Sequence, residues 1–169
     1  GAFNFSWPSG RNFELAGPFR RGANFFVGEV NFTNLPIAYV RTSAEITGWP
    51  PEKLVDGDLG SCWSSSLESS AAASHWIEIE FGYLERVDRI VLTPRFQGLG
   101  FPNSYSIEVW QNDSWQTVPD HSYVRYGRSS GDSFAHFFSP PLFTEKLRII
   151  TSELGDDGYN FYFQLAEIQ

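Results

Sequence analysis

The chain has 169 residues, of which 41% are hydrophobic, 17% aromatic and 19% charged. A chain of this length can bury a core within one domain, and its aromatic content excludes intrinsic disorder. The 12 basic and 20 acidic residues give a net charge of −8. This charge argues against nucleic acid and anionic membrane lipid as partners, because both are negatively charged.

The sequence also limits the covalent and cellular context. Cys62 is the single cysteine, so an internal disulfide is excluded. Zinc sites built from Cys and His clusters are excluded because His75, His121 and His136 lack ligand spacing with Cys62. No apolar run reaches the 18 residues that a membrane-spanning helix needs. Because the chain starts with Gly1 and contains no Met, we expect it to be a monomeric module within a longer multidomain precursor.

Composition changes near residue 40. Residues 1–40 are rich in Gly, Asn, Pro and Phe and carry a net charge of +1, which leaves −9 for residues 41–169. Segments such as Phe3-Asn4-Phe5, Asn24-Phe25-Phe26 and Asn31-Phe32-Thr33 predict short strands broken by turns. We therefore expect residues 1–40 to be an N-terminal extension whose added strands pack on a main domain spanning residues 38–169.

Regular strand signals begin at residue 38. Apolar and charged residues alternate over 75–81 and 105–110, and further strand-like runs occupy 87–92, 133–138, 146–151 and 159–168. No amphipathic pattern longer than two helical turns separates them. Strands at this spacing without intervening helices predict an all-β fold, an antiparallel sandwich or barrel.

The sharpest local motif is Asp56-Gly57-Asp58, followed by Ser61, Cys62 and Trp63. Two carboxylates that flank a glycine can converge on a hard cation, because glycine permits the tight backbone that this requires. The same triplet is common in ordinary turns. Both interpretations remain open on these residues alone.

Six segments, taken in order, resemble the coagulation factor V/VIII type C (discoidin) domain. They are Thr42–Glu45, Leu54–Asp58 with Trp63, His75–Gly82, Leu92–Arg95, Phe101–Ile107 and Phe163–Ile168. Among the branches of that family, the chain is most similar to bacterial family 32 carbohydrate-binding modules. The resemblance implies a jelly-roll-like β-sandwich of the galactose-binding-like type, and it covers residues 38–169.

The resemblance also implies a structural calcium ion, held by the Asp-Gly-Asp loop and the last strand. Carried over by position, the ligands are the side chains of Asp56, Asp58, Ser61 and Glu167 and the carbonyls of Lys53 and Ala166. Such an all-oxygen set suits Ca²⁺ and not a soft metal. The alternative is that Asp56 and Glu167 only accept backbone hydrogen bonds.

A sugar site on the loops at one end of the sandwich is implied as well. By position, the contacts are Glu45, Arg95, Asn103 and Tyr162, with Tyr159 and Phe161 as alternative aromatics. Ser64 stands where galactose-binding members often carry His, so galactose itself is not implied. Arg95 as a surface ion-pair partner and Tyr162 as a core residue remain the alternatives.

Catalysis is not expected. His136 alternates with Phe134 and Phe138 on a predicted strand, which indicates a structural histidine, and the adjacent Asp156 and Asp157 cannot face each other across a glycosidase cleft. Two functions remain open. One is a non-catalytic carbohydrate-binding module of a secreted, periplasmic or surface-exposed bacterial glycan-processing protein, and the other is a protein-interaction or structural discoidin domain without sugar binding.

Overall fold

The computed structural model describes residues 3–6, 12–15, 34–124 and 132–169. The chain divides into two compact units, residues 1–33 and residues 34–169. In the first, β1 (Phe3–Ser6) pairs antiparallel with β2 (Asn12–Leu15). The strands expected at Asn24–Phe26 and Asn31–Thr33 lie outside the described residues, and the packing of residues 1–40 on the main domain stays a prediction.

The second unit is built almost entirely from strands. They are β3 (Tyr39–Thr42), β4 (Trp63–Ser64), β5 (Trp76–Thr93), β6 (Ser104–Gln111), β7 (Ser114–Val124), β8 (Phe134–Glu153), β9 (Gly155–Asp156), β10 (Phe161–Tyr162), β11 (Gln164–Leu165) and β12 (Glu167–Ile168). Two short 3₁₀ segments, η1 (Pro51–Leu54) and η2 (Phe96–Gly98), join them. The described residues contain no α-helix, and none of their helical segments has the length and apolar character needed to cross a bilayer.

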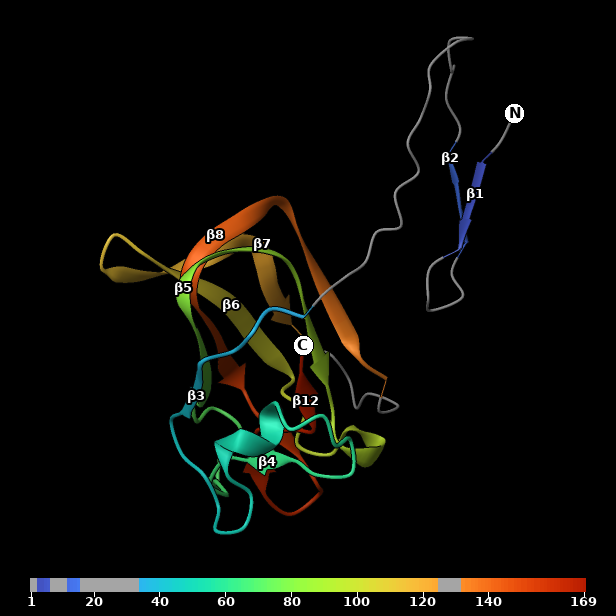
Figure 1. Ribbon diagram of the computed structural model, residues 1–169. Coiled ribbons are helices and arrows are strands. Elements are labelled where there is room, and N and C mark those ends of the chain that lie inside the picture. Colours follow the sequence, from blue (N-terminus) through green and yellow to red (C-terminus); the bar gives the residue numbers. More distant parts are fainter. Residues whose placement is uncertain (1–2, 7–11, 16–33, 125–131) are drawn as a thin grey trace, which may run out of the picture. The chain divides into compact units, whose positions relative to one another are not determined.

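One long ribbon organises the unit. β5 and β8 pair antiparallel from Trp76 opposite Ile150 to Leu92 opposite Phe134, with irregularities between Glu80 and Glu85 and again between Val87 and Arg89. Gly82, in the first irregular stretch, has φ +83°, a conformation that side chains with a Cβ rarely adopt. The ribbon bends over there, so that its two halves form the two layers of the sandwich (Figure 1).

The remaining strands extend the two halves of this ribbon. β3 pairs with the first half of β5, while β6 pairs with the second half of β8 and then with β7. β12 pairs with the end of β5, at Leu92 and Thr93. Every pairing is antiparallel, so the predicted all-β antiparallel sandwich is confirmed.

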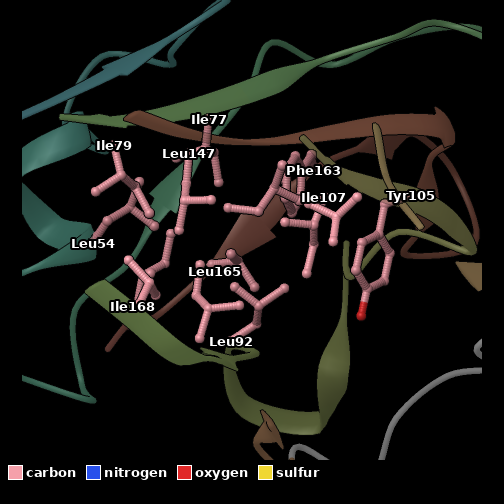
Figure 2. Packing of buried hydrophobic residues seen from close by; sticks show 14 of the residues in the cluster. Leu54, Ile77, Ile79, Leu92, Tyr105, Ile107, Leu147, Phe163, Leu165 and Ile168 are labelled. Carbon is pink, nitrogen blue, oxygen red and sulfur yellow. The ribbon is translucent and has the colours of Figure 1, made fainter. Parts of the chain in front are cut away.

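The core lies between the layers and follows the period-two pattern of the sequence. Ile77 and Ile79 are 0% and 1% exposed, whereas Glu78 and Glu80 between them face outward, where Arg41 and Lys146 pair with them. Leu92 from the far half of β5 and Ile107, Leu147 and Ile168 from other strands belong to the same cluster, as do Leu54, Phe163 and Leu165 (Figure 2). Burying each such side chain contributes about 1.5–3 kcal/mol.

Two groups of strands differ from the sequence-based expectation. The strands expected at 75–81 and 87–92 are parts of β5, and those at 133–138 and 146–151 are parts of β8, because ladder pairing resumes beyond each bend. The strand expected at 159–168 is instead β10, β11 and β12, which pair with three different partners, β9, β4 and β5. Partner choice depends on the neighbours available in space, which the alternation pattern does not encode.

His136 on β8 is a structural residue, as its strand position predicts. The imidazole is 5% exposed, and its Nε2 lies 2.8 Å from the hydroxyl of Tyr105. Burial lowers the pKa of His136 from 6.5 to about 4, with a smaller contribution from His121. The ring is therefore neutral in the folded protein at neutral pH.

This burial predicts an acid-sensitive contribution to stability. Because the folded-state pKa is depressed, the contribution is complete above pH 6.5 and is lost as the pH falls toward 4. We expect the native protein to lose roughly 2–3 kcal/mol more than a His136→Gln variant over that interval. Urea unfolding of both proteins across the interval measures the difference, and parallel pH profiles would contradict it.

Candidate functional site

Four loops gather at the end of the sandwich where β5 begins and β8 finishes, in the lower part of Figure 1 near β4. Backbone hydrogen bonds join them in pairs. Leu154 donates to the carbonyl of Ala71 at 2.8 Å, and Gln164 donates to that of Gly100 at 2.9 Å. These loops comprise residues 43–50, 65–75, 94–103 and 154–163, and they contain every sugar contact that the sequence predicts.

Arg95 is the arginine of this loop end. It follows β5 after the buried Pro94 and is itself exposed. Its guanidinium carbon sits 4.2 Å from the ring centroid of Trp49, a cation–π contact that fixes the side chain without consuming all of its hydrogen-bond donors. Trp49 was not among the predicted contacts. Its only signal in the sequence is its place between Gly48 and Pro50, in a turn closed by a 2.9 Å bond from its N–H to the carbonyl of Ile46.

Tyr162 is a buried residue at this end, with 7% of its surface exposed. A Cβ added to Gly100 would lie 2.1 Å from Cε2 of the Tyr162 ring, so glycine is what allows the loop to cover this ring. Burial raises the pKa of the Tyr162 hydroxyl, Asp157 raises it further, and Arg95 acts in the opposite direction. The packing agrees with the core interpretation of Tyr162, although its hydroxyl lies within the electrostatic reach of Arg95.

Tyr159 is the exposed aromatic of the late loop. It is 92% exposed and sits in a tight turn where its N–H and that of Asn160 both donate to Oδ1 of Asp157 at 2.9 Å. The preceding Gly158 donates to Oδ1 of Asp156 at 2.8 Å. Both aspartates therefore fix the turn that presents Tyr159 to solvent.

The two remaining predicted sugar contacts are Glu45 and Asn103, and they differ in exposure and in hydrogen bonding. Glu45 is exposed in the same segment as Trp49. The Asn103 amide donates to Glu153 Oε1 at 3.4 Å and to the carbonyl of Leu154 at 3.2 Å. Asn103 thus ties the loop before β6 to the end of β8.

Two buried polar residues lie on paired strands at this end. Ser64 on β4 and Gln164 on β11 are cross-strand partners, 2% and 4% exposed. The Ser64 hydroxyl donates to the carbonyl of Ser65 at 3.2 Å, while Oε1 of Gln164 has no hydrogen-bond partner among the described residues. A buried acceptor without a partner costs free energy. Sequence reasoning identified Ser64 but not Gln164, which becomes notable only through the strand pairing.

A hydrogen-bonded chain holds the neighbouring loops in place. Ser43 Oγ lies 2.9 Å from Nδ1 of His75, whose Nε2 lies 3.1 Å from Glu68, and Ser66 donates to the same Glu68 oxygen at 2.8 Å. These bonds lower the pKa of Glu68, with that from Ser66 the larger cause. The chain joins segment 43–50, which carries Glu45 and Trp49, to the long loop before β5.

The predicted calcium ligands lie in the loop after η1 and on β12. Oε2 of Glu167 accepts the N–H of Gly57 at 3.2 Å, and Oδ2 of Asp56 accepts the Ser61 hydroxyl at 2.8 Å and lies 3.5 Å from Nζ of Lys53. Burial raises the pKa of Glu167, and the charge of Asp56 raises it further. Glu167 and Asp56 are therefore near each other in the structure.

Asp58 is placed differently. Its Oδ1 accepts the N–H of Gly60 at 2.9 Å, so its carboxylate belongs to its own turn. Among the described residues, no three His, Cys, Asp or Glu side chains form a group that could hold a metal ion. The ligand types suit calcium, and in this structure the Asp58 carboxylate is engaged by Gly60.

Comparison with known proteins identifies a family and a set of solved structures that are similar to this chain. The model of the F5/8 type C domain family matches residues 39–168. No curated protein is similar enough in sequence to count as a match. Many solved structures share the fold.

Three of these structures illustrate the likeness. The family 32 module of NanJ from Clostridium perfringens, in complex with galactose, has a TM-score of 0.64 and 22% identity over 77% of this chain and 90% of its own. Chitosan-binding module 1 from a Paenibacillus sp. IK-5 chitosanase/glucanase has a TM-score of 0.65 and 20% identity, and the match covers 81% of this chain and 97% of that module. A family 32 module from Clostridium perfringens, in complex with GalNAc-β-1,3-galactose, has a TM-score of 0.64 and 16% identity over 77% and 91%.

The contact between Gly100 and Tyr162 predicts a position-specific loss of stability. A Gly100→Ala variant places a Cβ 2.1 Å from the ring and strains a backbone at φ +70°, so we expect the free energy of unfolding to fall by about 2–4 kcal/mol. Gly158→Ala is the matched control, because its φ is +97° but nothing lies within 4 Å of its added Cβ. It should lose only about 1 kcal/mol. Equal losses in urea unfolding would mean that the Tyr162 contact contributes nothing.

Proposed function

Because the chain belongs to the F5/8 type C domain family, we propose that it is a non-catalytic carbohydrate-binding module. In this proposal it attaches a larger secreted or cell-surface glycan-processing protein to glycans and binds a terminal sugar or short glycan at its loop end. The modules with the same fold that were solved with galactose and with GalNAc-β-1,3-galactose support it.

The placement of Arg95 is the observation that carries the proposal. An exposed guanidinium held over the Trp49 indole presents charged donors to sugar hydroxyls in a fixed orientation. Tyr159, 92% exposed in the adjacent loop, offers the flat apolar face on which the C–H groups of a sugar ring pack. Glu45 supplies a charged acceptor. In this assignment Tyr159 and not the buried Tyr162 provides the aromatic platform.

Recognition at such a site is weak and depends on geometry. A shallow, exposed site leaves much of the ligand hydrated, so we expect a dissociation constant on the order of 0.1–1 mM, about 4–5.5 kcal/mol. Attachment of the whole protein then depends on several modules acting together. We assign no preference for galactose, because Ser64 stands where galactose-binding members of the family often carry His.

A second candidate function is a protein-interaction domain that does not bind sugar. The amide of Asn103 is engaged by Glu153 and Leu154, and Tyr162 is buried, so two of the expected contacts are committed to the fold. The glycan-binding experiment with Arg95→Ala, described next, also distinguishes these two functions.

Replacement of Arg95 by alanine tests the proposal. We expect Arg95→Ala to lose at least tenfold in affinity for any glycan bound by the parent on a broad array, because charge-assisted bonds contribute about 1.5–3 kcal/mol each. Its melting temperature should change little, since Arg95 is exposed. Arg86→Ala, which removes another exposed arginine at an ion pair with Asp88, should bind as the parent does.

Two outcomes would contradict this assignment. Undiminished binding by Arg95→Ala places the sugar elsewhere. Absence of binding to any glycan at millimolar concentration favours the protein-interaction domain.

We further propose that calcium binds at Asp56, Asp58 and Glu167 and stabilises the fold without taking part in any reaction. Glu167 supports this, because it is 5% exposed and has the carboxylate of Asp56 nearby, an arrangement that a cation would relieve. Ser61 and the carbonyls of Lys53 and Ala166 are the further ligands in this proposal. The ion would fix the loop after η1 to β12.

Thermal melting with and without calcium tests this site. At a hundredfold excess over its dissociation constant, an ion bound only by the folded state adds about 2.7 kcal/mol, so the melting temperature should rise by several degrees from EDTA to calcium. Asp56→Asn should remove most of the rise, and Asp88→Asn, an exposed acid on β5, should keep it. Identical curves for the parent in EDTA and in calcium would rule the site out.

A further inference from the structure

A hollow lies far from the loop end, where the β6–β7 hairpin turns beside the bend of the β5–β8 ribbon. Its volume is about 380 Å³, and it is lined by Leu84, Trp110, Gln111, Asn112, Asp113, Phe143 and Glu145. β6 runs from Ser104 at the loop end to Gln111 at this hollow, so the two places are roughly 23 Å apart. The turn between β6 and β7 projects on the left of Figure 1, away from β4.

Trp110 and Phe143 form an aromatic part of the lining, and residues outside the hollow pack against Trp110. Trp110 meets Trp115 edge-on with ring centroids 5.3 Å apart, and the guanidinium carbon of Arg148 lies 4.4 Å from the Trp115 ring. Glu108 in turn accepts a 2.7 Å bond from Nε of Arg148. Phe143 and Leu84 are 57% and 64% exposed, so the apolar part of the lining is open to a ligand.

The polar groups of the hollow are amides and carboxylates. Asn112 and Asp113 form the turn of the hairpin with φ +50° and +57°, so their backbone is fixed in a conformation that few residue types adopt. Gln111 precedes them, and Glu145 approaches from β8. No arginine or lysine belongs to the lining.

Basic side chains at neighbouring strand positions are engaged by acids outside the lining, and Arg86, opposite Phe143, lies 2.8 Å from Asp88. Lys146 lies 3.5 Å from Glu80 and 3.9 Å from Glu78, across β5, and Arg148 is bound by Glu108. Within the part of the chain that the structure describes, neither Asp113 nor Glu145 forms an ion pair. The hollow therefore combines an apolar wall with uncompensated negative charge, on a chain whose net charge is already −8.

We propose that this hollow is a second glycan-binding site that is specific for a sugar carrying a free amino group. The pyranose C–H face packs on Trp110 and Phe143, the ammonium group pairs with Asp113 and Glu145, and the amides of Gln111 and Asn112 bind hydroxyls. A neutral or N-acetylated sugar lacks the ammonium and gains nothing from the two carboxylates. This site is independent of the loop end and does not require Arg95.

The test uses glucosamine oligomers as the probe, with N-acetylglucosamine oligomers of equal length as the neutral control. In mildly acidic, low-salt buffer, we expect the glucosamine oligomer to shift the NMR signals of the Trp110 indole N–H and of the Gln111 and Asn112 side-chain amides. The acetylated oligomer should leave them in place. High salt should weaken the binding, because the paired charges are exposed and screened.

Three variants assign the binding to this hollow. Asp113→Asn combined with Glu145→Gln removes both charges, keeps the shape, and leaves position 113 with a residue that tolerates positive φ. We expect it to bind the glucosamine oligomer roughly five- to thirtyfold more weakly. Glu52→Gln, which removes an exposed acid in η1, should bind as the parent does, and so should Arg95→Ala.

Three results would overturn this inference. Equal shifts from both oligomers would show that charge plays no part. Loss of glucosamine binding in Arg95→Ala, but not in the double variant, would place the sugar at the loop end. Binding of a lysine-rich peptide in the absence of amino-sugar binding would make the hollow a protein contact. Since Arg95→Ala reports on the loop end alone, failure of either site is recognised separately.

Discussion

The antiparallel pairing of β5 with β8 is the constraint on which the rest of the domain depends. The 18 and 20 residues of these strands form a ribbon whose bend near Gly82 turns one continuous ladder into two layers. The core is then the space between the two halves of the same ribbon, filled by alternate residues such as Ile77 and Leu92. The two strands are paired on both sides of the irregular stretch at the bend, so most of their backbone groups still have a partner.

The same bend decides where function can lie. Both ends of the ribbon, near Trp76 and Leu92, come to one side, and the loops that follow them meet there. The bend itself and the β6–β7 hairpin occupy the other side. Loops and turns on a rigid scaffold present polar side chains to ligands. One end of the domain presents Arg95 over Trp49. The other end presents the carboxylates of Asp113 and Glu145 beside aromatic rings.

The loop end shows how much of a recognition surface is committed to holding itself in place. Asn103, His75 and Glu68 are engaged in hydrogen bonds between loops, and Tyr162 fills the space left by Gly100. What remains for a ligand is a small set of exposed groups around Arg95. Positioning by buried neighbours gives such a set a fixed geometry, which is what selectivity among similar sugars requires.

The sequence by itself determined the fold class, the family and the positions of the chemically important loops. Period-two alternation at Ile77 and Ile79 is local, and six short motifs in register identify the domain without any contact being known. Only the tertiary structure decided that 159–168 forms three strands with three partners, that Trp49 underlies Arg95, that Tyr162 is buried while Tyr159 is exposed, and that Gln164 faces Ser64. The hollow at Trp110 likewise unites residues from β5, β6 and β8. These features depend on which segments meet in space. The alternation of apolar and polar residues indicates which side chains are buried, but it does not identify the strand or loop that buries them.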